Sequence, residues 1–155
     1  MQSIIHHSFG EPAEVLQLAE MPRPEPKAGE VRIKTILSPM HNHDVWTVRG
    51  SYGYKPTLPA IGGSEAVGIV DAVGEGVDQS KLGQRVAVAG VHGSWAEYFI
   101  APAHDIIALN DAFDDDAVVQ LIGNGSGRLE SASQSPPCRS AFNCGCGFYW
   151  WQCQW

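Results

Sequence analysis

The amino-acid sequence predicts a mainly β fold, a partly open barrel with one short helix after the strands. Short apolar runs with strand-like alternation recur along residues 1–109, glycine turns separate them, and a single later segment has a helical pattern. With 155 residues, the chain has room for one domain, with or without a tail.

The first two strands are expected at residues 3–5 and 15–18, on either side of the turn signal Phe9-Gly10-Glu11-Pro12. Residues 21–29 hold three prolines. Because each proline removes a backbone donor, this segment is neither a helix nor a central strand. We expect it to be a connecting loop.

The later strands begin with residues 31–36, which alternate apolar and polar side chains as a half-buried strand does. Further strands are expected at residues 64–73, 85–89, 96–100 and 106–109. Asn110 or Asp111 is expected to cap a helix that runs into the apolar residues 118–122.

The pattern changes at residue 123, which predicts a domain at residues 1–122 and an atypical tail at residues 123–155. The tail has neither strand nor helix periodicity. Its four cysteines have C-x5-C-x-C-x6-C spacing, not the paired C-x2-C of structural zinc sites. Two hypotheses stay open: a segment shifted out of its ancestral reading frame, and a lineage-specific disordered extension. The glycines at residues 123–127 lack the following helix that a dinucleotide fingerprint requires.

Charge and hydropathy exclude several kinds of partner. The net charge of −7 argues against nucleic acid, because such binders cluster Lys and Arg. No apolar run is long enough to span a bilayer, so no membrane partner is expected. The N-terminus has no basic stretch followed by an apolar core, so it is not a secretory signal. A cytoplasmic location is expected.

Several motifs follow one another in a fixed order. They are Gly29-Glu-Val-Arg-Ile-Lys, Asp44, Arg49-Gly-Ser-Tyr-Gly, Leu58-Pro-Ala-Ile-Gly-Gly-Ser-Glu, Val73-Gly-Glu-Gly-Val, Leu82-Gly-Gln-Arg-Val and Gly93-Ser-Trp-Ala-Glu-Tyr. This succession, within residues 1–122, resembles the GroES-like catalytic domain of the medium-chain dehydrogenases/reductases.

The resemblance implies a GroES-like barrel and an NAD(P)H-dependent oxidoreductase. In that family the nucleotide lies in the cleft between this domain and a Rossmann cofactor domain. The chain would then be truncated before the cofactor domain, with the NADPH site of the full-length family largely missing. We therefore expect little or no turnover by the chain alone.

Zinc is not expected. In the zinc alcohol dehydrogenases of this superfamily, a Cys and a His hold the catalytic metal at the positions of His41 and Ser64, and a serine hydroxyl is a poor zinc ligand. A degenerate site made of His41, His43 and Glu65 is the alternative. The stretch around Pro39–Asp44, Tyr52 and Gly62–Glu65 looks more like the zinc-free 2-enoyl thioester reductases and quinone oxidoreductases.

The resemblance also assigns catalytic roles to Tyr52 and His41. Tyr52 would be the proton donor, because a phenol can stabilise the enolate-like charge that builds when hydride reaches an activated alkene. His41 stands where the family usually has Asn, and would replace its polar contact to substrate or nicotinamide. The substrate would be a small carbonyl, enoyl or quinone compound.

The cleft is predicted to include five more residues, for some of which a structural role competes. They are Asn42, His43, Asp44, Trp46 and Trp95. On an extended segment, His41 and His43 would face the same side and Asn42 the other. Asp44 is expected to cap a helix, Trp46 to be core or cleft wall, and Trp95 to be barrel packing or substrate wall.

Two further predictions concern side chains without a catalytic assignment. Glu65 is expected to be a buried carboxylate paired with Arg49 or another cation. The remaining histidines give no signal above that of surface or turn residues; they are His6, His7, His92 and His104.

Three functions remain open on the sequence. The first is the zinc-free reductase domain. The second is a non-catalytic binding or assembly module built on the same barrel, and a homodimer is possible. The third is a degenerate zinc alcohol dehydrogenase.

Overall fold

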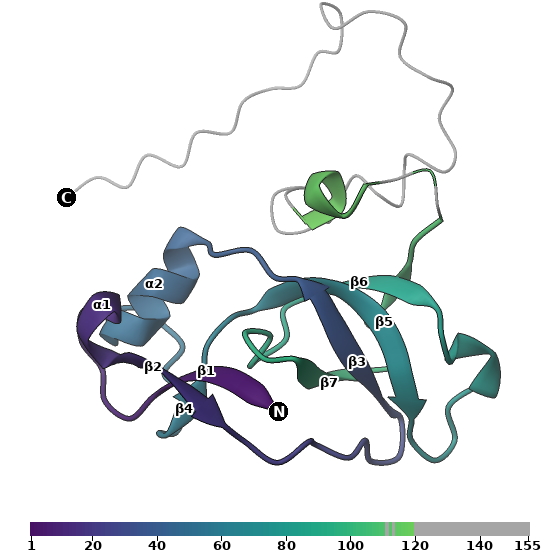
Figure 1. Cartoon of the computed structure of the whole chain (residues 1–155), viewed down its shortest axis with the longest axis horizontal. Helices are drawn as coiled ribbons and strands as arrows, with labels where there is room; N and C mark the ends of the chain where they lie inside the picture. Colours follow the sequence, from purple (N-terminus) through teal and green to yellow (C-terminus); the bar gives the residue numbers. More distant parts are fainter. Residues whose placement is uncertain (111, 113, 120–155) are drawn as a thin grey trace, which may run out of the picture. The chain divides into compact units, whose positions relative to one another are not determined.

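The computed structural model describes residues 1–110, 112 and 114–119, and strands predominate in it (Figure 1). Two antiparallel sheets are present among these residues, one of three strands and one of five, and neither closes on itself. The predicted mainly β, partly open architecture is confirmed. Residues 120–155, with the four cysteines and both hypotheses for the tail, lie outside the described residues.

The smaller sheet has the order β2-β1-β4. The strand β1 (Gln2–His6) pairs with β2 (Leu16–Glu20) on one side and with β4 (Ala60–Ile61) on the other. Between β1 and β2 lies α1 (Pro12–Val15), a single helical turn that begins with proline. Proline suits the first turn of a helix, where its missing N–H would be unpaired in any case. The predicted second strand therefore begins at residue 16 instead of 15.

The larger sheet has the order β7-β3-β5-β6-β8. Its strands lie close to their predicted positions: β3 (Glu30–Leu37), β5 (Glu65–Val73), β6 (Arg85–Ala89), β7 (Tyr98–Pro102) and β8 (Ile107–Ala108). A short 3-10 helix, η1 (Gln79–Lys81), lies between β5 and β6.

Both faces of the larger sheet are packed. One face carries the main core, which includes Val31, Ile33, Val70, Val86, Val88 and Phe99. Because side chains alternate along a strand, Val67 and Ala87 point the other way, and there they pack with Val118 and Val119. The last two valines belong to a helical turn at residues 115–119.

That helical turn begins later than predicted. Asn110 does not cap it: its side-chain oxygen accepts a hydrogen bond from the Ala112 N–H at 2.9 Å and closes a local turn instead. The first helical hydrogen bond joins the Val118 N–H to the Asp114 carbonyl at 3.0 Å. Asp111, the other predicted cap, lies outside the described residues.

The helix α2 (Asn42–Arg49) corrects the prediction of an extended segment through His41 and His43. Only Asp44 and Val48 are buried on it, so it lacks the apolar stripe that reveals a helix in a sequence. Its start is stabilised by Asp44, whose carboxylate accepts the His41 backbone N–H at 2.9 Å. Its end is set by Gly50, at φ 74°. Asp44 was expected to cap a helix; the cap itself is His41, and Asp44 stabilises the helix start from the third helical position.

The proline-rich segment is a loop, as predicted, and Arg32 of β3 ties it to the larger sheet. Arg32 donates to Asp71 at 2.7 Å and to the Pro24 carbonyl at 3.0 Å, and it forms an ion pair with Glu25 at 2.9 Å. Burial lowers the pKa of Arg32, but the bonds and charges of Asp71 and Glu25 outweigh this and leave it raised.

Within the described part of the chain, no helix has the length and apolar character needed to cross a membrane.

Candidate active site

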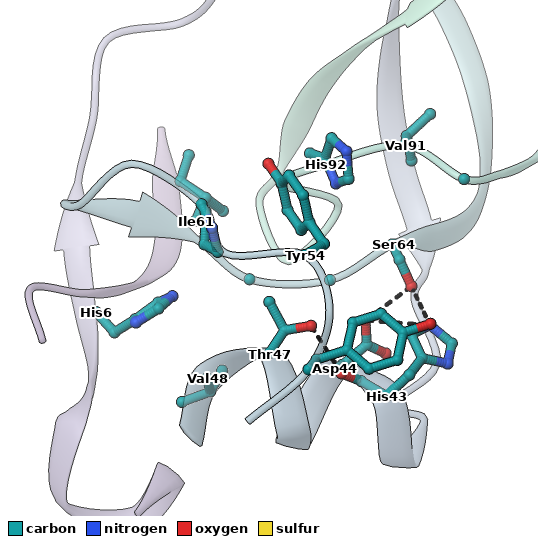
Figure 2. Close-up of a pocket in the computed structure, with 16 residues that line it drawn as sticks. His6, His43, Asp44, Thr47, Val48, Tyr54, Ile61, Ser64, Val91 and His92 are labelled. Carbon is teal, nitrogen blue, oxygen red and sulfur yellow. Dashed lines mark hydrogen bonds and ion pairs between the residues drawn. The ribbon is translucent and has the colours of Figure 1, made fainter. Parts of the chain in front are cut away.

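A pocket of about 210 Å³ lies where β1, α2, the residue 61–64 segment and the residue 90–93 segment meet (Figure 2). Its walls combine apolar side chains, such as Val48, Ile61 and Val91, with several polar groups. The polar side chains are His6, His43, Asp44, Thr47, Tyr52, Tyr54, Ser64 and His92. Apolar walls with a few convergent polar groups are typical of small-molecule sites.

Three rings follow one another along the start of α2 and the turn after it. The imidazoles of His41 and His43 stack with their centroids 5.3 Å apart, and the ring of Tyr52 lies 6.0 Å from that of His43. The ring beside Tyr52 is therefore that of His43, one of the predicted cleft residues. His41 is the N-cap of α2 and His43 lies in its first turn, so the two rings stack but only His43 reaches Tyr52.

His41 is bound to a carboxylate. Its Nε2 lies 2.9 Å from Oε2 of the buried Glu65. The prediction that Glu65 is buried is confirmed, and the partner is His41, not Arg49. Arg49 instead pairs with Glu11 at 2.9 Å on the surface. His41 is not among the side chains that line the pocket.

A hydrogen-bond chain orients His43. The Ser64 hydroxyl lies 2.7 Å from Asp44 Oδ1 and 2.7 Å from His43 Nε2. The carboxylate only accepts, so the single hydroxyl proton goes to Asp44, and Ser64 must accept its second bond from the His43 Nε2–H. Ser64, at the expected zinc-ligand position, thus accepts from the His43 Nε2–H and fixes the orientation of that ring.

Gly62 and Gly63, which precede Ser64, allow the backbone to pass close to Trp95. A Cβ on Gly62 would overlap the ring of Trp95, and a Cβ on Gly63, at φ +89°, would overlap Ser94 Oγ and the same ring. Trp95 is buried beneath them and donates its Nε1–H to the Pro39 carbonyl at 3.2 Å. Trp95 was predicted to be either barrel packing or a wall of the substrate cleft, and its buried position fits barrel packing.

The other predicted cleft residues lie apart from the pocket. Trp46 on α2 is 48 % exposed, so it is not a core residue, and Asn42 is exposed at the helix start. Neither lines the pocket, whereas Tyr52, His43 and Asp44 do. The extended segment assumed in the sequence analysis explains the difference, because a helix distributes residues 42–46 around its axis.

Three pocket residues carried no signal in the sequence. His6 is buried, although it was grouped with surface histidines. Tyr54 and His92 stack with centroids 4.2 Å apart and an interplanar angle of 11°. These two rings also border a second hollow of about 620 Å³, lined by residues of the proline-rich loop and β7. Only the pairing of strands and loops far apart in sequence brings these residues together.

Metal-ligating side chains do not gather here: no group of three or more His, Cys, Asp or Glu suited to a metal ion occurs among the described residues. The absence of zinc stays a prediction.

Known proteins resemble this chain over the same region. Residues 27–111 match the family of the alcohol dehydrogenase GroES-like domain. The mitochondrial enoyl-[acyl-carrier-protein] reductase of Caenorhabditis elegans is 32% identical over 125 residues, which cover 79% of this chain and 36% of that protein. An alcohol dehydrogenase of Moraxella sp. (strain TAE123) is 31% identical, over 81% of this chain and 44% of its own length.

Solved structures agree with this likeness. The quinone oxidoreductase of Escherichia coli, complexed with NADPH, matches with a TM-score of 0.75 and 29% identity, over 86% of this chain and 41% of that one. The chain thus spans less than half of the length of each of these relatives.

Proposed function

Because the chain belongs to the medium-chain dehydrogenase/reductase superfamily, through its alcohol dehydrogenase GroES-like domain, we propose that it supplies the substrate side of an NADPH-dependent quinone or enoyl reductase. The observation that carries the proposal is the phenol of Tyr52 beside an oriented His43, both lining the pocket. The substrate would be a small molecule with a carbonyl conjugated to a double bond.

Tyr52 would bind the carbonyl oxygen of that substrate. When hydride reaches the conjugated system, negative charge builds on this oxygen, and a phenol O–H can stabilise it and then supply a proton. The neighbouring His43 is held by Ser64 and Asp44, so its ring cannot turn freely as the charge develops.

NADPH fits the described residues only in part. A pocket of about 210 Å³ is below the roughly 300–1,000 Å³ of drug-sized ligand sites, so it has room for one ring and not for a dinucleotide. We assign this ring to the substrate, and NADPH would supply the hydride when bound. Since the described residues contain no βαβ nucleotide-binding unit, the remainder of the cofactor would need another domain, and the chain alone is expected to turn over little.

Binding of a short enoyl thioester tests the proposal without that domain. We expect crotonyl-N-acetylcysteamine to shift the NMR signals of His43, and Tyr52→Phe to weaken its binding about 3- to 10-fold, the worth of one hydrogen bond. Tyr98→Phe is the matched control, because Tyr98 lines the second hollow and not the pocket. An unchanged affinity in Tyr52→Phe would contradict the role of the phenol.

Turnover is a separate test. Steady NADPH oxidation by the 155-residue chain at an ordinary enzymatic rate, about 1 s⁻¹ or more, would contradict the dependence of the chain on another domain.

A cytoplasmic location and a homodimer are also part of the proposal. The dimer is supported by Leu18, which is 69% exposed on the edge strand β2. Sedimentation of the wild type and of Leu18→Lys tests it: a dimer through this edge would become a monomer in the variant. A monomeric wild type would refute it.

A further inference from the structure

The rings of Tyr54 and His92 form a wall between the pocket and the second hollow. They stack with nearly parallel planes and centroids 4.2 Å apart, and both residues line both spaces. Tyr54 lies in the loop before β4, and His92 lies in the segment after β6. In Figure 2 the two rings lie beside each other, across the pocket from Thr47 and Asp44 on α2. One side of the pocket is therefore closed by two rings from separate loops.

This wall is not part of the core, unlike the side of the pocket formed by α2. His43 is bound to Ser64, and the Val48 side chain is 1% exposed. Tyr54, by contrast, is 42% exposed, and His92 is exposed as well. Neither of these two side chains has a hydrogen bond to another described residue, so each is held by its stacking partner. Either ring can therefore be removed by substitution without a loss of core packing.

The space behind the wall is larger and apolar. The pocket has a volume of about 210 Å³ and the second hollow one of about 620 Å³. Pro22, Pro59 and Ile100 line the second hollow and not the pocket. Because the pocket has room for one ring, a second ring fused to it would have to enter the second hollow through the wall.

We propose that Tyr54 and His92 are specificity-determining residues, whose stacked rings limit the pocket to substrates with a single ring or a short chain on the conjugated carbonyl. This inference rests on the proposed function and adds the size of its substrate. The stacking contact that is lost when the rings separate is of the same order as the gain from burying one more fused ring. The wild type therefore gains no affinity from the second ring.

Acetophenone and acetonaphthone are the probes, because they share a conjugated ketone, differ by one fused ring and do not react with cysteines. Binding to the full 155-residue chain is followed by NMR of the His43 ring. We expect the wild type to bind acetonaphthone no more tightly than acetophenone. In Tyr54→Ala, acetonaphthone should bind roughly 5- to 10-fold more tightly than acetophenone, from the additional apolar area that leaves water. His92→Ala, which removes the stacking partner of Tyr54, should change the ratio of the two affinities in the same direction.

Tyr98→Ala is the matched control, because it removes the same ring from a position that lines the second hollow and not the pocket. Its ratio of the two affinities should equal that of the wild type. Each ratio compares two ligands on one variant, so a change in the stability of the variant does not alter it. A ratio in Tyr98→Ala that shifts as far as the ratio in Tyr54→Ala would contradict the inference.

The outcomes separate the two proposals. If the wild type binds acetonaphthone more tightly than acetophenone, or if Tyr54→Ala keeps the ratio of the wild type, the role of the wall is refuted and the reductase site stands. If neither ketone moves the His43 signals of the wild type, the site itself is refuted, and the role of the wall with it. Should Tyr54→Ala fail to fold, His92→Ala decides, because His92 is an exposed loop residue. An unchanged ratio in that variant refutes the inference.

Discussion

The Ser3 hydroxyl is buried in β1 and has no hydrogen-bond partner among the described residues. A buried polar group without a partner carries a desolvation penalty of about 1–3 kcal/mol. We therefore expect Ser3→Ala to raise the free energy of unfolding by about 1 kcal/mol, measured by chemical denaturation. Ser38→Ala is the control and should lower it, because the Ser38 hydroxyl donates to the Glu65 carbonyl at 2.6 Å. Equal losses in both variants would show that Ser3 has a partner after all.

Single residues also show where sequence reasoning reached its limit at the site. The motif placed Tyr52 and its histidines near one another, and the structure brings Tyr52 and His43 to one pocket. The order of the rings depended on the backbone between them, which the motif does not specify. Glu65 was predicted to be buried with a cation, and only the tertiary contact between the start of β5 and the N-cap of α2 decides that the partner is His41.

Among the elements, β3 is linked to the proline-rich loop through the charged side chain of Arg32. Arg32→Met keeps the apolar stem and removes the bonds to Asp71 and Pro24. We expect a loss of about 1.5–3 kcal/mol in the free energy of unfolding, as for hydrogen bonds to charged groups. Arg23→Met is the control: Arg23 also pairs with Asp71, at 3.3 Å, but it is half exposed, so about 1 kcal/mol or less is expected. A larger loss for Arg23 than for Arg32 would contradict this ranking.

The helices and strands differ in how well they can be predicted from their sequences. The strands β3, β5 and β6 alternate or run apolar, and their predicted bounds differ from those observed by no more than one residue. The helix α2 is polar along most of its surface and depends on Asp44 and Gly50 at its ends. Its contacts are tertiary, so periodicity could not reveal it.

At the scale of the whole molecule, the larger sheet is covered on its second face by the last described helical turn. Val118 and Val119 are both buried against Val67 and Ala87. We expect the free energy of unfolding, measured by chemical denaturation, to be at least about 2 kcal/mol lower for a chain ending at residue 110 than for one ending at residue 122. The reason is that burying a valine contributes about 1.5–3 kcal/mol. Equal stabilities would mean that this second core contributes nothing.

The fold class followed from strand rhythm and glycine turns because these are local signals. The two-sided packing of the larger sheet did not, because its second face is completed by residues far along the chain. The same holds for the pocket, whose walls come from β1, α2 and the segments at residues 61–64 and 90–93.

The stacked rings of Tyr54 and His92 belong to the rims of both hollows. A ligand that parts these rings in one hollow changes the boundary of the other in the same movement. Occupancy at one place would then alter affinity at its neighbour, and by thermodynamic reciprocity the effect must be equal in both directions. Binding in the pocket and binding in the second hollow would thus be coupled through the stacked rings of Tyr54 and His92.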